Sequence, residues 1–161
     1  FFLKRKLFWR LFLNSLGFGL FFVAGASLDS VVTTAEWMLG GFIFGLYLPL
    51  ELIHVLAHMQ SDREKGFITL AHVHGEHRTM LMAVGCLGGL IAYTLLLAGL
   101  GTISVLFAAW SVLNLLLLLA SLLAFYKRNN NAETYRRLRL RAKLICGIYG
   151  MGMLGLLITN T

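Results

Sequence analysis

The sequence predicts an all-α integral membrane protein, a multi-pass bundle of about five transmembrane helices. Apolar residues make up 58% of its 161 residues and charged residues 13%, whereas soluble domains have about 45–50% and about 25%. A soluble domain of this size could not bury so much apolar surface. Five apolar stretches also approach the roughly 20 residues that a helix needs to cross the hydrocarbon core. We therefore expect residues 1–161 to form a single transmembrane domain.

Each predicted span has its own justification. In chain order the spans are residues 8–26, 37–57, 80–97, 103–126 and 144–159. The first follows a basic segment, and the second contains Pro49, which a membrane helix tolerates where neighbouring helices satisfy the freed carbonyl. The third and the fifth contain closely spaced glycines, which let helices approach each other in lipid. The fourth contains no charged residue and ends at the most basic segment of the chain.

The charge pattern predicts the topology. All fourteen basic residues flank the first span or lie between spans two and three or between spans four and five: Lys4, Arg5, Lys6, Arg10, Arg63, Lys65, Arg78, Lys127, Arg128, Arg136, Arg137, Arg139, Arg141 and Lys143. Five alternating spans place these segments on one side, and the positive-inside rule makes that side cytoplasmic. The opposite side has only Asp29 and Glu36. The expected partners of the basic residues are lipid phosphates and not nucleic acid.

One polar segment, residues 51–78, concentrates the ionisable side chains. Glu51, His54, His58 and Asp62 follow one another at spacings of three and four, so a continuous helix places them on one face. Ionisable groups at membrane depth usually face a bundle interior or a water-filled cavity. This row could bind a metal ion or an anion. Alternatively, Glu51 and His54 hydrogen-bond to neighbouring helices while Asp62 belongs to a solvated loop edge.

The run from Asp62 to Gly75 resembles the second aspartate-rich segment of the UbiA-type intramembrane prenyltransferases. Members of that family have there the pattern D-R-x-x-G-x-x-T-x-A-x-x-x-G, and six residues match it: Asp62, Arg63, Gly66, Thr69, Ala71 and Gly75. His54 matches a histidine that many members carry eight residues before the aspartate. The five predicted spans resemble helices five to nine of the family's nine, so the resemblance implies the C-terminal half of that fold.

The resemblance also implies roles for site residues. In the family, two aspartate-rich motifs hold Mg²⁺ on an isoprenyl diphosphate, so Asp62 is expected to be a metal ligand and Arg63 and Lys65 to contact the diphosphate. His58 stands where the family commonly has a second aspartate, which makes it a substitute metal ligand. Imidazole is a poor replacement for the hard oxygen ligands that Mg²⁺ prefers. The first motif, of the N-D-x-x-D type, does not occur in these 161 residues.

Three functions are compatible with these observations. The first is a UbiA-like subunit of a larger membrane complex, non-catalytic alone, which accommodates the isoprenoid tails of quinones, chlorophylls or carotenoids beside other transmembrane subunits. The second is an active Mg²⁺-dependent prenyltransferase, with the first motif supplied by an N-terminal half or a partner chain. The third, a transporter or channel subunit, explains buried His and Glu but not the pattern from Asp62 to Gly75. The missing motif and His58 favour the first.

Overall fold

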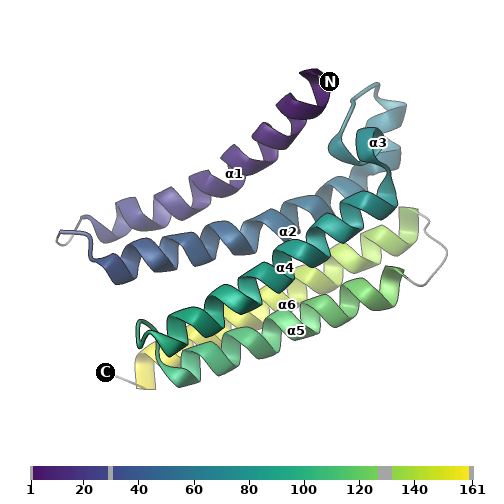
Figure 1. The fold of residues 1–161 in the computed structure, drawn as a ribbon. Helices are drawn as coiled ribbons and strands as arrows, with labels where there is room; N and C mark the ends of the chain where they lie inside the picture. The colour runs from purple at the N-terminus through teal and green to yellow at the C-terminus, as the bar shows by residue number, and fades with distance from the viewer. Residues whose placement is uncertain (1, 29–30, 127–131, 160–161) are drawn as a thin grey trace.

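A computed structural model describes residues 2–28, 31–126 and 132–159, and every regular element in these residues is a helix. The helices are α1 (Phe2–Ala26), α2 (Thr34–Glu64), α3 (Leu70–His74), α4 (Glu76–Gly99), α5 (Val105–Tyr126) and α6 (Ala132–Thr159) (Figure 1). Four of the predicted spans lie within long helices, and the other, residues 103–126, begins two residues before α5. The short helix α3 makes about one and a half turns between α2 and α4. The prediction of an all-α helical bundle is confirmed.

Four of these helices have the length and apolar composition needed to cross a membrane. They contain residues 9–26, 34–64, 76–99 and 105–125. The fifth predicted span forms the second half of α6, a helix of 28 residues whose first half is basic. Within the described residues α6 does not meet the same criterion. It nevertheless lies along α5 and α2 in the bundle (Figure 1).

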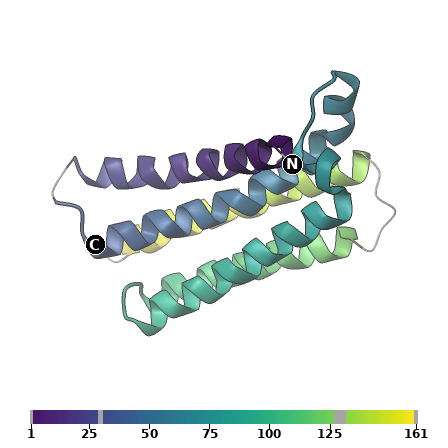
Figure 2. The ribbon, with the colours of Figure 1, turned by 45° about the horizontal axis from the view of Figure 1, so that its top comes forward.

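The helices α2, α4, α5 and α6 pack in a closed ring, each against the next. Within the described part of the chain, α1 packs only against α2 and α3, so it lies outside this ring (Figure 2). The ring encloses an apolar core that includes Ile53 and Leu56 of α2, Leu87 of α4 and Leu122 of α5, each nearly inaccessible. Large apolar side chains also cover the outside of α4 and α5. A bundle that is apolar inside and outside is suited to lipid as its solvent.

The basic segments gather at one end of the bundle. The start of α1, the turn between α2 and α4 that contains α3, and the start of α6 all lie at this end (Figure 1). The turns between α1 and α2 and between α4 and α5 lie at the other. Asp29, Lys127 and Arg128 fall outside the described residues. That the basic end is cytoplasmic stays a prediction.

Two glycines bring α1 and α2 into close contact near the end opposite the basic one. A Cβ atom on Gly19 would lie 2.6 Å from the carbonyl oxygen of Gly40, so only glycine fits there without a backbone shift. Further along the seam, Phe18 stacks on Tyr47 with ring centroids 3.8 Å apart, and Phe12 meets Phe44 edge-on at 5.1 Å. Beyond these aromatic pairs, toward the basic end, a cavity lies between α1 and α2.

Candidate functional site

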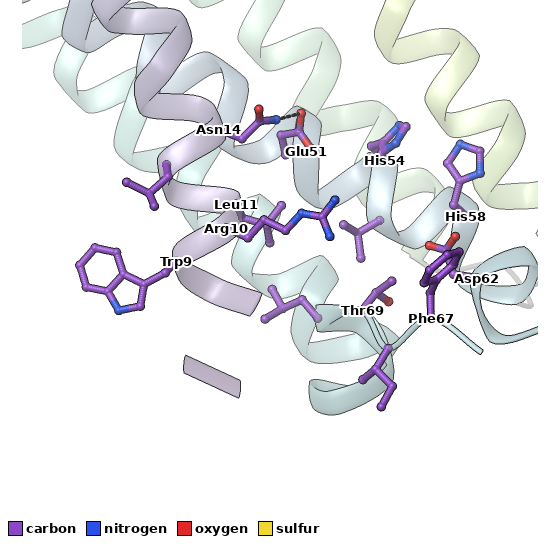
Figure 3. Close-up of a pocket in the computed structure, with 14 residues that line it drawn as sticks. Trp9, Arg10, Leu11, Asn14, Glu51, His54, His58, Asp62, Phe67 and Thr69 are labelled. Carbon is purple, nitrogen blue, oxygen red and sulfur yellow. Dashed lines mark hydrogen bonds between the residues drawn. The ribbon is translucent and has the colours of Figure 1, made fainter. Parts of the chain in front are cut away.

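The cavity lies between the first half of α1 and the second half of α2 and has a volume of about 1390 Å³. Residues 67–70, which follow α2, line its end (Figure 3). Its apolar lining includes Trp9 and Leu11 of α1 and Val55 of α2. Its polar lining consists of seven side chains: Arg10, Asn14, Glu51, His54, His58, Asp62 and Thr69. An apolar chain with a polar head matches this combination of surfaces.

The polar row of α2 lies on one face, as the spacing predicts. The helix runs without a break from Thr34 to Glu64, and its start is fixed by a capping box between Thr33 and Glu36. Because one turn takes 3.6 residues, all four members of the row point to the same cavity. The imidazole rings of His54 and His58 neighbour each other, with centroids 4.6 Å apart.

The deepest member of the row, Glu51, has a partner on α1. The Nδ2 group of Asn14 donates a hydrogen bond of 2.7 Å to Oε1 of Glu51 (Figure 3). Glu51 is seven residues deeper than His58, which corresponds to roughly 10 Å along the helix. The hydrogen bond offsets part of the cost of placing a carboxyl group at that depth. A hydrogen bond from Glu51 to a neighbouring helix was one of the two alternatives for the row, and in the structure the partner of Glu51 is Asn14.

A second contact ties the row to α6. The Nη1 group of Arg139 forms a hydrogen bond with Nε2 of His58. Arg139 is half-buried, whereas Arg136 and Arg137 before it on α6 are exposed. From the other side, the guanidinium of Arg10 extends from α1 into the space in front of α2 (Figure 3). The sequence indicated these two arginines only as members of basic segments, so their place beside the row is new information.

The profile of the UbiA prenyltransferase family matches residues 1–145 of the chain. The chain belongs to this family. No curated protein and no solved structure matches the chain. The match includes α1 to α5 and the basic half of α6, and therefore the whole cavity. The resemblance of the segment from Asp62 to Gly75 is thereby confirmed at the level of the family.

The UbiA-like segment folds as a turn with two left-handed glycines. Gly66 has a φ angle of 75° and Gly75 of 81°, a backbone conformation that other residues rarely adopt. The backbone N–H of Phe67 donates to the carbonyl of Asp62 over 2.8 Å, which closes the end of α2. His72 Nδ1 accepts the backbone N–H of Thr69 over 3.1 Å at the start of α3. The positive φ angles explain why glycine occupies these two positions of the motif.

The predicted site residues do not all reach the cavity. Asp62 and His58 line it, together with Glu51 and His54. Arg63 and Lys65 are exposed at the end of α2, and neither lines the cavity. Their predicted contact with a diphosphate stays a prediction. In this structure the arginine that lines the cavity is Arg10.

The donor groups of this UbiA-family cavity do not make a complete metal site. Among the described residues, no three His, Cys, Asp or Glu side chains are close enough together to hold one metal ion. Mg²⁺ demands near-octahedral oxygen coordination, usually through carboxylates, waters and phosphates. Asp62 offers one carboxylate, and the Nε2 of His58 contacts Arg139. The predicted Mg²⁺ ligation by Asp62 and His58 stays a prediction, and this set of residues does not fit it without further ligands.

Proposed function

We propose that this UbiA-family membrane protein binds an isoprenoid in the cavity between α1 and α2 and does not catalyse prenyl transfer alone. The observation that carries the proposal is the composition of the cavity. Apolar side chains of α1, of residues 67–70 and of Val55 line most of it, and the row from Glu51 to Asp62 lines one side. About 1390 Å³ exceeds the 300–1,000 Å³ typical of small-ligand pockets. A long apolar chain with a polar end uses such a space.

The absence of independent catalysis follows from the donor set. Ionisation of an isoprenyl diphosphate requires stabilisation of the charge that develops on the leaving group, and metal ions commonly supply it. Asp62 and Glu51 are the carboxylates of the cavity, and Glu51 already accepts a hydrogen bond from Asn14. The N-D-x-x-D motif does not occur in these residues. A bound isoprenoid would therefore remain intact.

The proposed setting is a larger membrane complex in which further transmembrane helices cover the open side of the cavity. In the described residues α1 packs against α2 and α3 alone, so the cavity lacks a third wall of long helices. His54 is exposed at membrane depth within α2. Exposing an ionisable side chain such as His54 to lipid costs free energy. Subunits that carry quinone, chlorophyll or carotenoid tails would complete the site, with the basic end of the bundle in the cytoplasm.

An active Mg²⁺-dependent prenyltransferase is the second candidate. The observation in its favour is that Asp62 and Arg10 face one cavity, where helices that carry the first aspartate-rich motif could complete a metal site. Those helices would come from another part of the polypeptide or from a partner chain. Prenyl transfer to an aromatic acceptor with Mg²⁺, by the purified chain alone, would refute the non-catalytic proposal.

Binding of radiolabelled geranylgeraniol to the protein in nanodiscs tests the proposal. Val55 lines the cavity, so Val55→Phe fills it and should reduce binding at least tenfold. Val105→Phe is the matched control, because Val105 is 78% exposed at the start of α5. Equal binding by both variants would place the ligand elsewhere. Failure of the unmodified protein to bind any isoprenoid alcohol or prenylated quinone would contradict the proposal.

A further inference from the structure

We propose that the basic half of α6 binds anionic phospholipid in the leaflet at the basic end of the bundle. The binding surface, the α6 outer face, consists of five exposed side chains: Arg136, Leu140, Arg141, Lys143 and Leu144. Lipid phosphates would meet its three cations, and acyl chains would lie along its two leucines. Among the described residues of α6 none lines the cavity between α1 and α2, so the inference is independent of isoprenoid binding.

The direction of the α6 outer face follows from the packing of this helix. Tyr135, Leu138 and Ala142 lie three and four residues apart and are almost completely buried, so one stripe of α6 faces the bundle. At the start of this stripe, the hydroxyl of Tyr135 donates a hydrogen bond of 2.9 Å to Oε2 of Glu76 on α4. The side chains on the opposite side of α6 therefore point away from the protein, and Leu144 is 66% exposed.

The five cations in the basic half of α6 have different surroundings. Arg137 pairs with Glu133 on the helix surface at 3.0 Å. Arg139 contacts His58 and is half-buried. The remaining three are exposed: Arg136, Arg141 and Lys143. Within the described residues no carboxylate pairs with any of these three, so the α6 outer face carries an uncompensated positive charge.

Contacts between the neighbouring helices α5 and α6 fix the depth of these cations (Figure 1). Trp110 on α5 donates a hydrogen bond of 3.2 Å to the carbonyl of Tyr149 on α6. The guanidinium carbon of Arg141 lies 5.1 Å from the ring centroid of Phe125, so the two helices run antiparallel. The apolar span of α5 ends at Phe125. Arg141 is therefore level with the end of a span, and Lys143 lies about 3 Å nearer to its middle.

The end of an apolar span is the depth at which the phosphate groups of a bilayer meet its hydrocarbon core. A cation in hydrocarbon costs free energy, and long lysine and arginine side chains avoid this cost by extending along apolar surface to the interface. Lys143 needs such an extension, whereas Arg141 is already at the interface. Arg136 is five residues before Arg141, about 7.5 Å further out. The three cations therefore lie where an anionic phospholipid carries its charge.

The leucines of the α6 outer face favour lipid over a soluble anion as the partner. Leu140 and Leu144 are 55% and 66% exposed, and both lie within one turn of the cations. Exposed leucines also cover the neighbouring α5, among them Leu116 and Leu123, so apolar surface extends from the basic end toward the middle of the bundle. A soluble acidic polypeptide would leave this surface uncovered, whereas the acyl chains of a phospholipid cover it.

Competition between two phospholipids tests the inference. The purified protein in detergent is offered an equimolar mixture of phosphatidylglycerol and phosphatidylcholine with the same acyl chains, and native mass spectrometry measures which lipid stays bound. Each cation near anionic lipid contributes about fivefold to binding, so the preference for phosphatidylglycerol should be about tenfold or more. Arg141→Gln combined with Lys143→Gln removes two of the three cations and should lower this preference by about fivefold or more.

Controls separate the charge of this surface from net charge and from misfolding. Arg78→Gln is the matched control, because Arg78 is an exposed cation at the start of α4, and it should leave the preference unchanged. The exchange of Arg141→Lys with Lys143→Arg keeps both charges and should keep most of the preference. Thermal melting of each variant in phosphatidylcholine reports on folding. An increase in salt from about 0.1 M to about 0.5 M should weaken the preference of the unmodified protein, because exposed charges are screened.

Three outcomes would overturn the inference. The first is equal retention of the two phospholipids by the unmodified protein. The second is a preference that survives the double substitution, or that Arg78→Gln lowers by as much. The third is displacement of phosphatidylglycerol by an equal concentration of a hexaglutamate peptide, which would assign the surface to an acidic polypeptide. Because the α6 outer face lies outside the cavity, none of these outcomes bears on isoprenoid binding.

Discussion

The two halves of α2 belong to one helix but have different surroundings. In residues 34–50, Gly40 faces Gly19 of α1 with no room for a Cβ atom on Gly19, and Tyr47 stacks on Phe18, so the seam is tight and apolar. In residues 51–64, the same face carries four ionisable side chains and borders a cavity. Close packing excludes ligand from the first half. The open second half leaves space for a polar head, so under the proposed function the first half of the helix serves packing and the second half binds the ligand.

The topology gives an all-or-none test of this contrast. In a background of Cys86→Ala and Cys146→Ala, single cysteines at Thr33 and Lys65 mark the two ends of α2. We expect an impermeant thiol reagent to label them from opposite sides of the membrane, with Lys65→Cys and Arg136→Cys on the same side. Labelling of Thr33→Cys and Lys65→Cys from one side would rule out α2 as a span.

Packing in the first half should be sensitive to one methyl group. Gly19→Ala places a Cβ atom 2.6 Å from a backbone oxygen, so the helices must separate, and we expect a loss of about 1–3 kcal/mol in unfolding free energy. Gly17→Ala is the control, because no heavy atom lies within 4 Å of its Cβ position. Denaturation in mixed micelles measures both. Equal stability of the two variants would show that the seam is looser than described.

The second half should resist conversion into a metal site by one substitution. In His58→Asp the new carboxylate would pair with Arg139 instead of binding Mg²⁺, so we expect no gain in Mg²⁺ affinity. The double variant His58→Asp with Arg139→Gln should bind Mg²⁺ about tenfold more tightly than either single variant, because it has the carboxylate and lacks the competing cation. Calorimetric titration measures the affinity. A gain in Mg²⁺ affinity from His58→Asp alone would show that Arg139 does not compete with the metal ion.

The smallest effect is expected at the boundary between the halves. Glu51→Leu leaves the amide of Asn14 without its acceptor, and we expect a loss of about 1 kcal/mol in stability. Glu51→Gln keeps an acceptor oxygen and should lose less. A double-mutant cycle with Asn14→Leu should give a coupling of about 0.5–1 kcal/mol. Additive effects would mean that Glu51 depends on another partner.

Much of this arrangement could be predicted from the chain because it depends on local periodicity. The apolar stretches gave the helices, and the spacing of Glu51, His54, His58 and Asp62 placed them on one face of α2. The pairs Asn14 with Glu51 and His58 with Arg139 join residues 37 and 81 positions apart, which no local pattern encodes. A polar residue inside an apolar span, such as Asn14, was the available signal for the first pair. Arg139 is one of several arginines on α6, so nothing marked it.

The UbiA-like segment from Asp62 to Gly75 shows a second limit of prediction from sequence. Asp62 and Arg63 are neighbours in one matched pattern, yet successive residues on a helix differ by about 100° in direction. Asp62 lines the cavity, and Arg63 is exposed outside it. Family patterns identify residues that share a segment, whereas side-chain direction decides which of them meet a ligand. Arg10, which no motif includes, is in the cavity for the same reason.

The hydrogen bond between Asn14 and Glu51 has a consequence for the synthesis of the protein. An ionisable residue at the centre of a helix costs about 2.5–3.5 kcal/mol on insertion scales, and Glu51 lies within the second span. The first span, with Asn14, leaves the ribosome before it. When α2 enters the bilayer beside α1, the amide donor is already present to receive the carboxyl group. Because α1 precedes α2 in the chain, α2 with Glu51 inserts beside a helix that already carries its hydrogen-bond donor, Asn14.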